Sequence, residues 1–172
     1  ARYVARNLLK AHAPALFTGH LCQAHPQASV IFSLSRMIMA MISARGGALT
    51  QGANAAGAWA AGAIPFRGPA AQKIAKPGYH AGDILSGSSL RTIIMMGFEP
   101  HLDTLYGRQA IKSLQGIDQV IALSSYQSKS LRECADIILP ISTHGETSGT
   151  MINVTGSRQS FEAFRQAPGE VR

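Results

Sequence analysis

Residues 92–97 read Thr-Ile-Ile-Met-Met-Gly, residues 119–123 read Gln-Val-Ile-Ala-Leu, and residues 136–140 read Asp-Ile-Ile-Leu-Pro. These short apolar runs lack polar alternation, and two segments of helical character, 104–115 and 128–134, separate them. Apolar strands that alternate with helices are typical of a parallel sheet buried on both faces. The sequence therefore predicts the α/β class, as a three-layer parallel sheet with helices on both faces.

The flanking sequence extends this pattern. A helix is expected over residues 2–12 and a short strand over 15–18. A second helix is expected to begin at Pro26 and to end at Gly46-Gly47, because proline suits a first helical position and glycine ends helices. The middle of the chain is expected to hold an Ala/Gly-rich stretch over residues 52–63, a loop over 66–78 and a short helix over 80–86. The C-terminal segment is expected to be loop-rich, with two short extended pieces over residues 149–155 and 158–161.

Composition restricts the class of protein. The chain has 172 residues, of which 46% are hydrophobic and 15% charged, and this excludes intrinsic disorder. Two cysteines exclude a disulfide scaffold and any four-cysteine zinc or iron–sulfur site built within this chain alone.

The most apolar helical run, 36–43, is far shorter than the roughly 20 residues that cross a bilayer. No signal peptide is recognisable, so the expected compartment is the cytoplasm. The sequence reads as an excerpt of a longer polypeptide.

The net charge of +7 leaves two interpretations open. One is an acidic partner, such as nucleic acid, a phosphate-bearing ligand or an anionic membrane face. The other is a basic solvated surface, which we favour because the excess comes from few acidic residues and no segment clusters Lys and Arg. The aromatic content of 6% offers no stacking platform for single-stranded nucleic acid. Nucleic acid is therefore not an expected partner.

The strand end at residues 97–100 is the first candidate site. Ligands of open parallel sheets bind beyond the carboxyl ends of the strands. Gly97 would allow a sharp turn there, and Glu99 would place a carboxylate in the crevice, where it favours a hydroxyl or amine donor and repels phosphate. The alternative is a plain loop in which Pro100 and Asp103 start the next helix.

Other chemical motifs are weak. Residues 52–57 lack the middle glycine of a dinucleotide-binding loop, and no phosphate-binding Gly-Lys-Ser/Thr loop is present. His20, Cys22 and His25 lack a second ligand pair, so no metal site is expected. Both cysteines are expected to be buried and inert, and no catalytic residue is predicted.

One C-terminal run is specific. It comprises residues 133–140 (Glu-Cys-Ala-Asp-Ile-Ile-Leu-Pro), 145–153 (Gly-Glu-Thr-Ser-Gly-Thr-Met-Ile-Asn) and 156–159 (Gly-Ser-Arg-Gln). It resembles the Ala-Asp-x-x-Leu-Pro, Glu-x-x-Gly-Thr, Asn and Gly-Arg-x-Gln series of the molybdopterin oxidoreductase superfamily, although Ser157 separates the Gly from Arg158. Residues 92–100 resemble that superfamily's strand and loop.

Three further segments narrow the resemblance. Residues 52–58, 66–69 and 168–172 are similar to the large peripheral-arm subunit of NADH-quinone oxidoreductase, which is respiratory complex I. The resemblance implies an α/β domain of a longer subunit whose N-terminal part carries iron–sulfur clusters, with no cofactor in this fragment. It also implies other respiratory-complex subunits as partners, and a cytoplasmic location peripheral to the inner membrane.

Two functions are carried forward. The first is a structural and assembly domain of that peripheral-arm subunit, residues 1–172, which supports electron transfer from NADH to quinone without catalytic groups of its own. The loop of pterin-binding relatives often reads Gly-x-Asn-Pro, and Glu99 occupies the Asn position. The alternative is the pterin-guanine-dinucleotide-binding domain of a formate dehydrogenase or nitrate reductase relative. The resemblance implies the following pocket residues, vestigial in the first case: Gly97, Glu99, Glu146, Gly149, Thr150, Asn153 and Arg158.

Overall fold

The computed structural model describes residues 2–23, 25–87 and 89–169. The chain divides into two compact units, one of residues 1–57 and 152–157 and the other of residues 58–151 and 158–172. The segment 168–172 that contributed to the resemblance lies partly outside the described residues, since 170–172 are not described.

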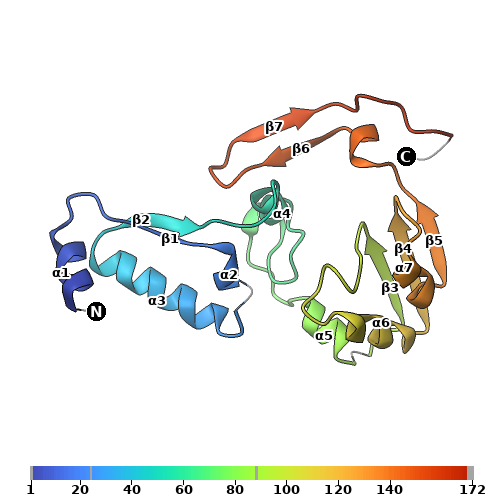
Figure 1. Cartoon of the computed structure of the whole chain (residues 1–172), viewed down its shortest axis with the longest axis horizontal. Helices are drawn as coiled ribbons and strands as arrows, with labels where there is room; N and C mark the ends of the chain where they lie inside the picture. The colour runs from blue at the N-terminus through green and yellow to red at the C-terminus, as the bar shows by residue number, and fades with distance from the viewer. Residues whose placement is uncertain (1, 24, 88, 170–172) are drawn as a thin grey trace. The chain divides into compact units, whose positions relative to one another are not determined.

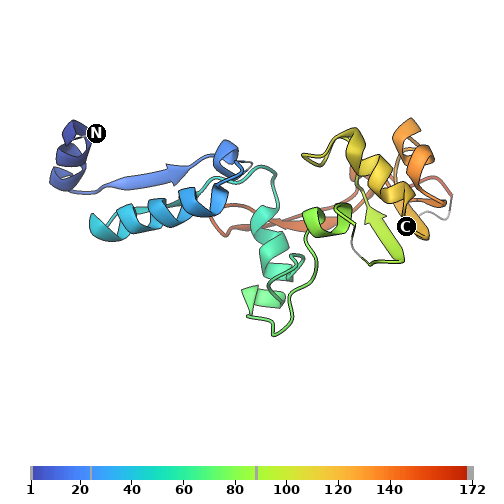
Figure 2. The same ribbon diagram turned by 90° about the horizontal axis from the view of Figure 1, so that it is seen from below.

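The first unit is a strand–helix–strand arrangement. It holds α1 (Arg2–Lys10), β1 (Ala15–Thr18), α2 (His20–Gln23), α3 (Ala28–Met41) and β2 (Arg45–Ala48). β1 and β2 pair in parallel, with Ala15 opposite Arg45 and Thr18 opposite Ala48. Helix α3 connects the two strands and runs beside them (Figures 1 and 2). A parallel pair needs such a crossover connection.

Strand β2 was not predicted. Its sequence is Arg-Gly-Gly-Ala, and glycine was interpreted only as the end of the preceding helix. Glycine is depleted in strands because it has no side chain to pack and loses more entropy on folding. Here the backbone of β1 supplies the pairing partners instead, and the Arg45 N–H donates to the Pro14 carbonyl at 3.1 Å just before that strand.

The second unit contains the predicted parallel sheet, and its α/β class is confirmed. Its strands are β3 (Thr92–Met96), β4 (Gln119–Ser124) and β5 (Ile137–Pro140), in the order β3-β4-β5. Both strand pairs are parallel, with Ile94 opposite Ile121 and Ile121 opposite Ile137. Helices α6 (Arg108–Gln115) and α7 (Lys129–Cys134) are the crossovers between them (Figure 1).

The hydrophobic core of this unit lies between the sheet and its helices. Met95, Val120 and Ala122 point from the strands into a cluster of buried helical residues: Leu85, Ala110, Ile111, Leu114, Leu131 and Cys134. Strand residues alternate between faces. Ile94 and Met96, on the opposite face of β3, are exposed. The core thus holds the carboxyl ends of β3 and β4 beside the start of α7.

Shorter elements complete the chain. They are α4 (Ala55–Ala61), the 3₁₀ turn η1 (Pro69–Ala71), α5 (Ala81–Leu85), the 3₁₀ turn η2 (His144–Glu146), and the strands β6 (Gly149–Ile152) and β7 (Arg158–Phe161), which form a two-stranded sheet. No helix among the described residues combines the length and the apolar character that a membrane crossing requires.

Candidate functional site at the carboxyl ends of β3 and β4

The turn after β3 is built on Gly97. Its φ of +58° lies in the left-handed region that glycine adopts without strain, as the sequence predicted for a sharp turn. The Gly97 N–H donates to the Leu123 carbonyl at 2.8 Å, which ties the turn to the neighbouring strand. Next, the Glu99 N–H donates to the carboxylate of Asp103 at 2.7 Å, and the Thr104 hydroxyl donates to the Pro100 carbonyl at 2.8 Å. Residues 97–104 therefore form one ordered turn.

The Glu99 carboxylate reaches the beginning of α7. Its Oε2 atom accepts hydrogen bonds from the Ser128 hydroxyl at 2.8 Å and from the Ser130 hydroxyl at 2.9 Å. Ser128 also caps α7, since its hydroxyl oxygen accepts from the Leu131 N–H at 3.1 Å. Ser130 is only 8% exposed. Glu99 is thus held in one orientation by two serines that follow the end of β4.

A hollow of about 460 Å³ lies beside this carboxylate. Its wall has two acidic and two basic side chains, and Arg108 and Glu133 pair across 3.2 Å. Leu102 and Tyr126, each 71% exposed, add apolar and aromatic surface. The complete lining is Glu99, His101, Leu102, Arg108, Tyr126, Ser128, Lys129, Ser130 and Glu133. This composition suits a ligand with hydrogen-bond donors.

The other predicted pocket residues lie along the segment from η2 to β7 and do not line this hollow. Thr150 and Ser160 hydrogen-bond across β6 and β7 through their hydroxyls at 2.9 Å, and Arg158 is the exposed first residue of β7. The Asn153 side-chain oxygen accepts from the Thr155 N–H, the Thr155 hydroxyl and the Ser157 N–H at 3.0, 2.7 and 2.9 Å. Asn153 therefore shapes the connection between β6 and β7.

Gly149 begins β6 and has no positive φ. A Cβ atom at this position would lie 3.0 Å from the ring of Phe161 on β7. That separation is closer than ordinary van der Waals contact, so a side chain at this position would require the Phe161 ring to shift by a few tenths of an ångström.

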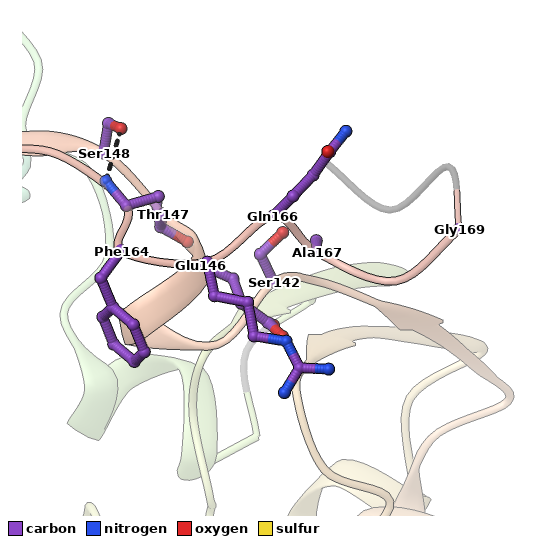
Figure 3. Close-up of a pocket in the computed structure, with 10 residues that line it drawn as sticks. Ser142, Glu146, Thr147, Ser148, Phe164, Gln166, Ala167 and Gly169 are labelled. Carbon is purple, nitrogen blue, oxygen red and sulfur yellow. Dashed lines mark hydrogen bonds between the residues drawn. The ribbon is translucent and has the colours of Figure 1, made fainter.

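A second hollow of about 970 Å³ surrounds Glu146. Figure 3 shows Ser142 and Glu146 on one chain segment and Gln166 and Ala167 on the C-terminal segment that also lines this hollow. The Ser148 hydroxyl accepts from the Ala163 N–H at 3.0 Å, which joins the two segments. Glu146 and Glu99 therefore line different hollows, although the resemblance grouped them in one pocket.

Comparison with known proteins identifies the family of this chain. The family model described as molybdopterin oxidoreductase matches residues 1–172. The chain belongs to the molybdopterin oxidoreductase family. Among curated proteins, the assimilatory nitrate reductase catalytic subunit of Bacillus subtilis (strain 168) is 28% identical over 94 residues. That alignment covers 55% of this chain and 13% of the relative, so the chain matches a small part of that protein's length.

The pterin cofactor that this family name implies does not fit the strand-end hollow. A bound diphosphate needs free donors and positive charge. The Ser128 and Ser130 hydroxyls both donate to Glu99, and Glu99 itself carries negative charge into the position. The Arg108 guanidinium already pairs with Glu133. A phosphate here would meet a fixed carboxylate, and Lys129 is the cation of the wall that has no ion-pair partner among the described residues.

Among the described residues, no three His, Cys, Asp or Glu side chains group as metal ligands. Cys134 is buried, and burial together with the nearby Glu133 and Glu99 carboxylates raises the pKa of its thiol. A raised pKa leaves less thiolate and makes this cysteine less reactive. Cys22 is half-buried rather than buried.

Sequence reasoning missed Ser128 and Ser130. Serine is common at helix starts for capping alone, so its presence there did not indicate a carboxylate partner. A usable signal existed in the strand end at 124–126, which the topology of a parallel sheet places beside 97–100. Strand order, not sequence spacing, brings the two segments together.

The pH dependence of η2 is a first prediction. Glu146 Oε2 accepts from the Thr143 N–H at 3.1 Å and its hydroxyl at 2.9 Å. These bonds lower the pKa of Glu146, most through the backbone N–H. Because the folded pKa lies below the unfolded one, the stabilisation is present at neutral pH and is lost as the pH falls through the lowered pKa.

We expect the amide exchange of Thr143 to accelerate below the ordinary pKa range of glutamate, as measured by NMR between neutral and acidic pH. Glu146→Gln should remove this acid-dependent step, with the intrinsic pH dependence of exchange subtracted. An unchanged acid profile in the variant would show that another group controls the turn.

Proposed function

We propose that this chain is the α/β domain of a large peripheral-arm subunit of NADH-quinone oxidoreductase, with a structural and assembly role and no pterin. The observation that carries the proposal is the Glu99 carboxylate fixed between the Ser128 and Ser130 hydroxyls. It places fixed negative charge at the strand ends, where ligands of this fold class bind.

The electrostatics of this position support the proposal. Two like charges brought close together repel, and moving a phosphate out of water costs further free energy without compensating donors. Glu99 is only partly exposed, so water screens this repulsion incompletely. The domain is then a folded scaffold whose surfaces contact neighbouring subunits of a respiratory complex, peripheral to the membrane on the cytoplasmic side. Iron–sulfur clusters would belong to another part of the parent subunit.

A second candidate is the pterin-guanine-dinucleotide-binding domain of a molybdenum oxidoreductase. The similarity to an assimilatory nitrate reductase catalytic subunit favours this candidate over the first. Lys129 in the wall of the strand-end hollow and the net charge of +7 would also suit phosphates. The two candidates differ in whether Glu99 excludes the dinucleotide.

Cofactor analysis separates the candidates. We expect the chain, expressed in a host that makes molybdopterin cofactors, to purify without pterin fluorescence and without molybdenum by elemental analysis. Glu99→Asn, which restores the amide of pterin-binding relatives, is the matched variant. The nitrate reductase subunit, prepared in parallel, is the positive control. Stoichiometric pterin in the wild-type chain would overturn the first candidate and favour the second.

Membership of a respiratory complex needs its own measurement. The parent protein, tagged in its own host, should migrate on a native gel with a band that oxidises NADH. Migration away from every such band would contradict the assignment to NADH-quinone oxidoreductase, even if no pterin were found.

A further inference from the structure

The wall of the strand-end hollow has three features that bear on a possible ligand. It has a carboxylate in a fixed orientation, a second carboxylate paired with a guanidinium, and exposed aromatic surface from Tyr126. Leu102 adds a large exposed apolar side chain to the same wall. Such a wall weakens hydration of a bound group, so it favours a ligand that is charged yet weakly hydrated.

The second carboxylate oxygen of Glu99, Oε1, determines whether the ligand is positively or negatively charged. Oε2 accepts from both serines, whereas no hydrogen bond within the described residues ends on Oε1. Ser130 is 8% exposed and anchors the carboxylate, so Oε1 has little freedom to turn away. A preorganised acceptor of this kind binds a cationic N–H donor through a charge-assisted hydrogen bond.

We infer that this hollow binds the guanidinium of an arginine side chain from a protein partner, an inference that rests on the assembly role proposed above. The guanidinium is planar, weakly hydrated and able to stack on an aromatic ring, whereas the ammonium of lysine is a compact and strongly hydrated charge. Glu99 would accept hydrogen bonds from its N–H groups, and the exposed Tyr126 in the wall is the aromatic side chain available for stacking. Within the same wall, Glu133 already binds the guanidinium of Arg108 at 3.2 Å.

The positive charges of the wall do not oppose this ligand. Arg108 is neutralised by Glu133, and Lys129 is an exposed residue in the first turn of α7. A lysine side chain with a long flexible stem keeps its ammonium in water at small cost. In addition, Nδ1 of His101 in this wall is buried and has no hydrogen-bond partner among the described residues. This nitrogen is therefore available for a hydrogen bond with a ligand.

The test is a titration of the full chain with Nα-acetyl-arginine amide, followed by NMR of the Tyr126, Ser128 and Ser130 amides. We expect saturable shifts at millimolar concentration. Glu99→Gln, checked for folding by circular dichroism, should weaken binding about tenfold, the lower end expected when a hydrogen bond to a charged group is lost. Glu162→Gln removes an exposed carboxylate outside the hollow and should leave binding unchanged.

Control ligands make the outcome decisive. Nα-acetyl-norleucine amide or Nα-acetyl-lysine amide that binds equally well would overturn the inference, as would wild-type affinity in Glu99→Gln. Guanosine diphosphate is titrated separately. If neither arginine amide nor the diphosphate binds, the guanidinium inference fails and the assembly role stands. If the diphosphate binds with shifts of the same amides and arginine amide does not bind, the guanidinium inference and the assembly role both fail.

Discussion

Replacing Leu131 by alanine is expected to destabilise the second unit by about 2–5 kcal/mol, the usual cost of deleting a buried leucine side chain. Leu131 has no exposed surface and lies in the core between the sheet and its helices. The cavity left behind would lie in the cluster that holds Val120 and Leu114, both fully buried, so collapse around it is limited. The measurement is urea unfolding followed by circular dichroism, read as a shift of the midpoint at constant slope.

Leu105→Ala is the matched control. It removes the same atoms from a side chain that is 83% exposed, in the turn before α6. We expect a change within about 0.5 kcal/mol, as for surface substitutions in general. Equal losses for the two leucines would contradict the placement of the core on the α7 side of the sheet.

The sheet was predictable because burial dictates the composition of its strands. The runs expected at 92–96 and 119–123 correspond to β3 and β4 nearly to the residue, since an apolar run without polar alternation is typical of a parallel strand. Burial on both faces does not follow from that pattern, because Ile94 and Met96 on one face of β3 are exposed. The helix expected over 104–115 begins later, at Arg108, because Gly107 has a φ of +52° that no α-helix contains. Local propensity alone had not located that start.

The site was predictable in part, for a geometric reason. Gly97 and Glu99 follow a strand end, where topology concentrates functional groups, and the structure places them there. The residues of the C-terminal run were grouped with them only because the family resemblance included both segments. Short polar contacts, such as that of Asn153 with Ser157, instead serve the fold of their own segment. A shared sequence motif therefore does not imply a shared cavity.

Asp136→Ala is expected to cost about 1–3 kcal/mol, because it leaves a buried N–H without its acceptor. Asp136 Oδ2 accepts from the Val120 N–H at 2.7 Å, and the Asp136 N–H donates to the Val120 carbonyl at 2.8 Å. Val120 is 1% exposed, so water cannot replace the lost oxygen. Both bonds lie at the beginning of the β4–β5 pairing and set its register. The free energy of unfolding in urea measures the loss.

The variant Asp136→Asn separates the hydrogen-bonding role of Asp136 from the effect of its negative charge. Asp136→Asn keeps a side-chain oxygen that can accept from the Val120 N–H, so it should retain more stability than Asp136→Ala. Hydrogen exchange of the Val120 amide should be faster in Asp136→Ala than in the wild type and intermediate in Asp136→Asn. Equal exchange in all three proteins would refute the contact. Asp136 belongs to the Ala-Asp-x-x-Leu-Pro part of the family resemblance. Slower exchange in the wild type than in both variants would therefore explain that aspartate by its hydrogen bond to the neighbouring strand.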